Sequence, residues 1–136
     1  MTAETSAAVD AVVQGSFAVL DALTRSAAEH DLSLTQLRLL GILRDRTPSM
    51  AAIADHLGLD RSSVSGLIDR AERRGLVTRR TSSDDARVTN IHLTATGVDV
   101  AEQLAVTVGG RVEALLARLN AVERRHVVAL ARALSQ

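Results

Sequence analysis

The sequence predicts a mainly α-helical fold with one small β-hairpin. Apolar residues recur at helical spacing through most of the chain, and two short stretches near its middle are rich in Val, Thr, Ile and Leu. The 136 residues include one Phe and no Trp or Tyr, so the core must consist of small aliphatic side chains, which suits closely approaching helices. We expect one domain over residues 1–136, because the chain is too short for two conventional domains.

Two helices are expected before the first proline. Apolar residues at helical spacing predict a long first helix over residues 5–30. Ser33 and Gln36 match a capping box and begin the second helix. Thr47-Pro48 ends it, because a residue before proline is pushed out of the α region.

A short and an amphipathic helix follow. Ser49 caps residues 50–57, and Gly58 supplies the left-handed residue that commonly ends a helix. Asp60 caps the fourth helix, which Gly75 ends. Four residues of the fourth helix form one apolar stripe that we expect to be buried: Val64, Leu67, Ile68 and Ala71.

The second half of the chain returns to helix after a hairpin. Residues 76–81 and 88–93 alternate β-branched and polar residues and predict two strands. Thr94 caps a long fifth helix, and Asn120 begins the last one. Gly109-Gly110 lies inside the fifth helix, at a cost of roughly 1 kcal/mol per Gly relative to Ala. It marks a kink, a close crossing or an earlier end of the helix, and of these we favour a close crossing between two copies of the chain.

Charge and cysteine content restrict the function. The net charge is zero, yet residues 61–92 contain seven Arg against four acidic residues, whereas residues 1–30 contain one Arg against four. The basic middle favours a phosphate-bearing partner. The absence of Cys excludes disulfides, thiolate metal sites and cysteine nucleophiles.

Membrane and export signals are not expected. No uninterrupted apolar run approaches the ~18–20 residues that cross a bilayer, and the first residues lack the basic and apolar regions of a signal peptide. We therefore expect a cytoplasmic protein with no membrane partner.

Residues 50–93 have the order of a winged helix-turn-helix: two short helices, a tight turn and a hairpin with a charged tip. Ala54 lets the two helices approach and Gly58 permits the turn. Val64 and Leu67 seat the second helix, whose front end is left exposed.

The larger pattern resembles the MarR family of multiple antibiotic resistance regulators over nearly the whole chain. The segments that carry the resemblance are Leu34–Leu37, Ile53–Leu59, Val64–Arg70, Arg74–Arg79, Asp85–Arg87 and Leu93–Gly97. The resemblance implies a bacterial homodimeric transcription regulator on a pseudo-palindromic operator in double-stranded DNA. Residues 5–30 and 94–136 would form the dimerisation helices, and residues 33–93 a winged helix-turn-helix lobe.

Eight residues are candidates for DNA binding. The front turn of the helix after Asp60 would enter the major groove, placing Ser62, Ser63 and Ser65 near base edges. The arginines of this helix, Arg61, Arg70 and Arg73, would meet bases or phosphates. In the wing, the family pattern implies that Arg87 enters the minor groove while Asp85 holds its guanidinium.

Two features depart from the family pattern: Gly66, and a wing tip at residues 82–87 that lacks the Gly or Pro often seen there. Gly66 stands where relatives often carry a longer polar or basic side chain. One contact to a base or a phosphate is therefore expected to be missing, which would make the sequence specificity modest.

Other interpretations stay open. Arg70, Arg73 and Arg74 could form a solvated helix face, and Asp85 with Arg87 an incidental surface pair worth under about 1 kcal/mol. A winged-helix module that binds protein instead of DNA is the alternative function. No phosphate loop, nucleophile elbow or metal-ligand spacing of the four His is present, so we expect neither an enzyme nor a metal or other cofactor. A repressor released by a small-molecule effector follows from the resemblance alone.

Overall fold

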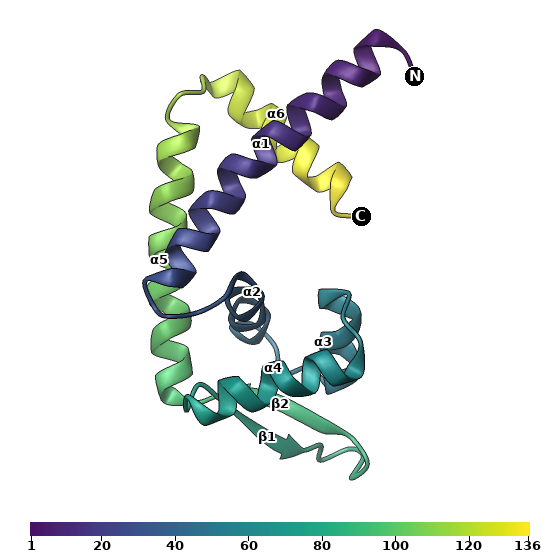
Figure 1. The fold of residues 1–136 in the computed structure, drawn as a ribbon, viewed down its shortest axis with the longest axis vertical. Helices are drawn as coiled ribbons and strands as arrows, with labels where there is room; N and C mark the ends of the chain where they lie inside the picture. Colours follow the sequence, from purple (N-terminus) through teal and green to yellow (C-terminus); the bar gives the residue numbers. More distant parts are fainter.

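The computed structural model describes residues 1–136 and confirms a mainly helical fold with one antiparallel hairpin (Figure 1). In Figure 1, α2, α3, α4 and the hairpin form a compact group at one end, which we call the lobe, while α5 runs from the hairpin to the other end. The elements in chain order are α1 (Ala3–Ala28), α2 (Leu34–Leu43), α3 (Met50–Leu57), α4 (Arg61–Arg73), β1 (Val77–Thr81), β2 (Thr89–Leu93), α5 (Ala95–Leu116) and α6 (Ala121–Leu134).

Five helices begin directly after the polar N-cap residues that were predicted from the sequence. In each of the five predicted caps, a side-chain oxygen accepts a hydrogen bond from the backbone N–H three residues later, which satisfies a free donor of the first turn. These caps are Ser33, Ser49, Asp60, Thr94 and Asn120. Thr2 caps α1 in the same way, so this helix begins two residues before the predicted start.

Helix ends were predicted less well. Gly58 and Gly75 have φ of 65° and 71°, and the helices before them end as expected. However, α2 ends at Leu43, several residues before Pro48, because proline restricts only the residue before it and polar residues 44–46 offer no apolar contact for another turn. α1 ends at Ala28, and Asp31 at φ 55° turns the chain toward α2.

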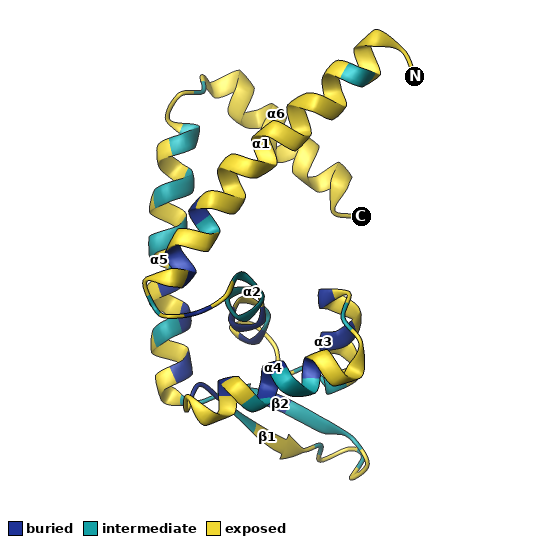
Figure 2. Ribbon diagram, viewed as in Figure 1, coloured by how far each residue is buried: buried dark blue, intermediate teal, exposed yellow.

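One apolar core lies in the lobe and extends to the long helices. The predicted stripe of α4 is buried, and Leu39, Leu40, Ile53 and Ile91 complete the centre. Ala27 of α1 belongs to the same cluster, as do Ala101 and Leu104 of α5. The lobe therefore packs on the end of α1 and on the first half of α5 (Figure 2).

Backbone contacts join the hairpin to the start of α3 and to the start of α5. Val77 pairs with Leu93 and Thr81 with Thr89, while an isolated bridge joins Ser49 to Asn90. At the other end, the Thr94 N–H donates to the carbonyl of Leu76 at 3.0 Å. A Cβ at Gly97 would lie 1.9 Å from that carbonyl oxygen, so only glycine permits α5 to start this close to the hairpin.

The long helices leave apolar side chains uncovered. α6 has no buried residue, and Figure 2 shows most of α1 and all of α6 exposed. Contrary to expectation, α1 is long and apolar enough to cross a membrane by length and composition alone, since a window of 18 of its residues has a mean hydropathy of 1.3. Ala and Val raise this average even though Asp10 and Asp21 interrupt the apolar run.

Candidate nucleic-acid interface

The front turn of α4 is exposed and held by its cap. The Asp60 carboxylate accepts from the Ser63 backbone N–H at 2.7 Å and from the Ser62 hydroxyl at 2.8 Å. These hydrogen bonds lower the pKa of Asp60 below its ordinary value. Arg61, Ser62 and Ser63 remain exposed, so the cap presents their side chains to an incoming partner.

A groove joins the front of α4 to the base of the wing. Arg61 and Ser65 come from α4 and Arg87 from the hairpin loop, and they meet around a hollow of about 470 Å³. Met50, Ala51, Val64 and Val88 give its floor an apolar character. Three predicted site residues from separate parts of the chain are thus brought together, two of them cationic.

The wing arginine is oriented by its acidic neighbour. The Arg87 side chain, 91% exposed, donates from Nε to Asp85 Oδ1 at 3.1 Å and from Nη2 to Oδ2 at 3.2 Å. The Arg87 backbone N–H adds a bond to the same carboxylate at 3.0 Å. These contacts lower the pKa of Asp85, and they fix the guanidinium at the loop without removing it from solvent.

The remaining predicted residues lie on the other side of α4. Ser62, Ser63, Gly66 and Arg70 line a hollow of about 370 Å³ facing the start of α2. Arg70 Nη1 lies 3.2 Å from the position a Cβ would take at Gly66. The Arg70 side chain therefore lies over Gly66 and places a guanidinium where a contact was expected to be missing.

Arg73 extends this cationic side of α4 without bonding outside its own helix. Its Nε donates to the Asp69 carbonyl at 3.4 Å. It lines a hollow with Arg70 and Arg74 beside the first turn of α2. Of the eight predicted residues, six lie on α4, with Arg61 and Ser65 on its wing side and the other four on its α2 side, while Asp85 and Arg87 lie in the hairpin loop.

Two arginines of the basic segment bond to other elements of the chain. Arg79 Nη2 pairs with Asp69 at 2.6 Å and its Nη1 with Glu72 at 3.5 Å, which ties β1 to α4. Arg74 donates to backbone carbonyls near the end of α1. Arg80 is exposed on β1 without such a partner, and it was not among the predicted site residues although its strand leads to the wing tip.

The sequence is similar to one family model and to two transcription regulators. Residues 30–88 match the sequence model of the MarR family. The chain is 32% identical over 82 residues, 60% of its length, to the putative transcriptional regulatory protein for the hcr operon of Thauera aromatica, and covers 49% of that protein. It is 35% identical over 65 residues, 47% of its length, to the HTH-type transcriptional regulator YfiV of Bacillus subtilis, and covers 41% of it. The chain thus spans less than half of either relative.

Solved structures share the fold over most of the chain. Rv1404 of Mycobacterium tuberculosis matches with a TM-score of 0.84 at 22% identity, covering 100% of this chain and 97% of that one. NadR in complex with 4-hydroxyphenylacetate matches at 0.78 and 24% identity, covering 93% and 90%. An S. aureus MepR mutant bound to an oligodeoxyribonucleotide matches at 0.66 and 24% identity, covering 93% and 95%.

The match to residues 30–88 takes in α2, α3, α4, β1 and the wing loop, which are the elements that build the groove and both sides of α4. The long helices outside it have the arrangement seen in these solved structures. Over residues 30–88, the chain is therefore similar in sequence to the MarR family.

Proposed function

We propose that this protein is a homodimeric, sequence-specific transcription regulator that binds a pseudo-palindromic operator in double-stranded DNA. The groove that brings Arg61 and Ser65 of α4 together with Arg87 of the hairpin loop is the observation that carries the proposal. The MepR oligonucleotide complex supports it by fold. Such a protein would act in the bacterial cytoplasm, where the DNA is.

The exposed face of α4 would enter the major groove, where side chains reach base edges. Ser62, Ser63 and Ser65 would accept or donate hydrogen bonds there. Arg70, lying over Gly66, would reach a base or a phosphate, and Arg73 a phosphate behind it. Arg87, oriented by Asp85, would enter the minor groove and respond to its width and negative potential.

A second copy of the chain would cover the long helices. α6 has 14 residues, none of them buried, and an isolated helix of this length is marginal in water. On α1, Phe17 is 59% exposed and Val12 is 45% exposed. We propose that residues 5–30 and 94–136 form the dimer body and residues 33–93 the DNA-binding lobe.

Effector release would use a small cavity between α2 and α5. Its volume is about 160 Å³, and its lining combines apolar residues such as Leu37, Leu40 and Leu104 with the charged pair Arg44 and Asp45. This space suits one six-membered ring, and Arg44 suits a carboxylate. NadR with 4-hydroxyphenylacetate shows such a ligand in a related fold, and we propose repression relieved by a single-ring carboxylic acid that favours one lobe position.

Fluorescence anisotropy with DNA selected from a random duplex pool tests the DNA proposal. Binding should weaken with salt, and Arg87→Ala should lower affinity and reduce the log–log salt slope by about 0.9 if one phosphate contact is lost. Arg46→Ala, at an exposed arginine between α2 and α3 that lines none of the hollows around α4, is the matched control and should leave the slope unchanged. Absence of binding to any duplex at low salt would overturn the proposal and favour a protein partner.

The effector proposal needs its own measurement. Addition of 4-hydroxyphenylacetate or benzoate to the protein–DNA complex should lower the anisotropy, and Arg44→Gln should remove this response while DNA affinity is kept. A response that survives Arg44→Gln would place the ligand elsewhere.

A further inference from the structure

The end of α1 and the turn after it, residues 26–32, form the only chain connection between α1 and the lobe; we call this segment the α1–α2 junction. Glu29 follows the last helical residue and Asp31 adopts φ 55°. The Leu32 N–H closes the turn on the Ala27 carbonyl at 3.0 Å. The carbonyls of His30 and Asp31 are left without a helical partner, so they need donors from elsewhere.

Arg74 supplies those donors from the end of α4. Its Nη1 donates to the Asp31 carbonyl at 2.6 Å and its Nη2 to the His30 carbonyl at 2.8 Å. A planar guanidinium that makes two parallel bonds fixes orientation as well as distance. The residue that ends the proposed DNA-reading helix is thereby bonded directly to the junction.

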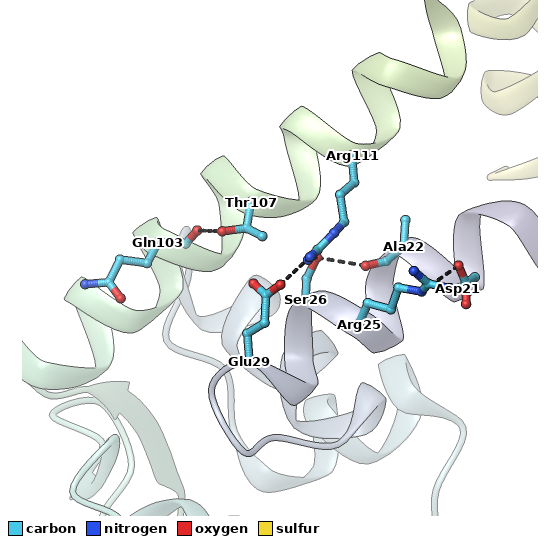
Figure 3. A network of polar contacts seen from close by, with 8 residues as sticks. All are labelled: Asp21, Ala22, Arg25, Ser26, Glu29, Gln103, Thr107 and Arg111. Carbon is cyan, nitrogen blue, oxygen red and sulfur yellow. Dashed lines mark hydrogen bonds and ion pairs between the residues drawn. The ribbon is translucent and has the colours of Figure 1, made fainter.

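Arg111 holds the same junction from α5, as Figure 3 shows. Its Nη1 donates to the Ser26 hydroxyl at 2.8 Å and its Nη2 to the Glu29 carboxylate. Ser26 is fully buried and its hydroxyl donates to the Ala22 carbonyl at 2.7 Å. The contact lowers the pKa of Glu29 and raises the pKa of Arg111, so the pair stays charged at neutral pH.

We propose that Arg74 and Arg111 are positioning residues that clamp the α1–α2 junction from both sides and so set the angle of α4 relative to the long helices. In the dimer, that angle would set the distance between the two copies of α4 and hence the spacing of half-sites that the protein accepts. This last step rests on the proposed function, whereas the clamp itself does not.

Apolar packing alone would leave this angle loosely defined. The core residues that α1 and α5 contribute against the lobe are Ala27, Ala101 and Leu104, and two of these three side chains are small. Burial of apolar surface is non-directional, so such contacts resist separation more than rotation. The hydrogen bonds of Arg74 and Arg111 are directional, so they restrict rotation of the lobe relative to the long helices.

Distance measurement between spin labels tests the clamp without DNA. Because the chain has no Cys, Gln14→Cys on α1 and Asp55→Cys on α3 place two labels at exposed helical positions. Labelled chains are diluted with excess unlabelled protein so that distances within one chain dominate. Arg74→Gln and Arg111→Gln should each broaden or shift the distance distribution.

Arg73→Gln is the matched control, because it makes the same charge change one residue away and Arg73 bonds only within α4. It should leave the distribution unchanged. If Arg74→Gln and Arg111→Gln also leave it unchanged while circular dichroism shows them folded, the clamp is overturned. A lower melting temperature with an unchanged distribution overturns it as well, since the arginines then only stabilise the fold.

A second measurement uses duplexes whose half-sites are moved apart or together by single base pairs. The wild-type protein should lose affinity steeply away from its preferred spacing, and Arg74→Gln should flatten this dependence several-fold while binding of a single half-site is kept. An equally steep profile in Arg74→Gln would overturn the link between the clamp and spacing. Failure of the wild-type protein to bind any duplex would instead overturn the proposed function, and the distance measurement would still decide the clamp.

Discussion

At the wing, one carboxylate decides where an arginine side chain points. Asp85 accepts three hydrogen bonds from Arg87, one from the backbone and two from the guanidinium. Both residues were predicted as a pair, because they stand two positions apart in a recognisable motif. By contrast, Arg74 was predicted only as one member of a helix face. Its carbonyl partners lie 43 and 44 residues away, and no local pattern relates them.

Removal of the guanidinium should be visible in the titration of Asp85. Its pKa is lowered in the folded protein mainly by Arg87, so the contribution of this pair to stability is present above the ordinary Asp pKa of about 4 and is lost as the pH falls through the lowered value. In Arg87→Ala, the pKa of Asp85 should rise toward its ordinary value. Carboxyl carbon shifts followed by NMR between pH 2 and 6 measure it, and an unmoved midpoint would show that the pair does not form in solution.

At the scale of helices and strands, caps and apolar stripes were predictable because they are local. The side chains of Ser33, Asp60 and Asn120 all cap where expected. The bridge from Ser49 to Asn90 was not predicted, because one paired residue before a helix carries no alternating pattern. The positions of the candidate site residues on α4 followed from helical spacing, but their division between a wing side and an α2 side depends on how the hairpin and α2 pack.

The start of α5 should tolerate no side chain at Gly97. A Cβ there would meet the Leu76 carbonyl oxygen at 1.9 Å, and because that atom is backbone it cannot rotate away. Overpacking a site typically costs roughly 1–3 kcal/mol. Gly97→Ala should lower the free energy of unfolding, measured by urea unfolding, by about 3 kcal/mol or more.

Gly41→Ala serves as the control, because nothing lies within 4 Å of a Cβ at this position inside α2. It should stabilise the protein by about 0.5–1 kcal/mol through helix propensity. Equal stabilities of the Gly97→Ala and Gly41→Ala variants would contradict the close approach.

For the whole molecule, the exposed faces of α1 and α6 predict association. Sedimentation of the wild-type protein at micromolar concentration should give twice the mass of 14.4 kDa. Phe17→Asp should give single chains, because a charge would have to be buried in the interface. Thr47→Asp, at an exposed position between α2 and α3 and outside the proposed dimer segments, should leave the dimer intact. A wild-type protein that sediments as a single chain would contradict the proposal that two lobes of a dimer bind DNA together.

Gly109 and Gly110 lie inside α5, with nothing within 4 Å of a Cβ at either position. The single chain therefore supplies no crossing helix at this point, and the interpretation as a crossing between copies remains a prediction. Alanine at both positions should weaken association if that prediction holds.

The folding of α6 is expected to depend on the concentration of the protein. Because α6 has no buried residue within its own chain, mass action would link its helicity to the concentration of the protein if a second copy covers it as proposed. Thermal melting should therefore shift upward as the sample is concentrated. In a cell with few copies, the same linkage would make occupancy of a target fall more steeply than for a molecule that folds alone.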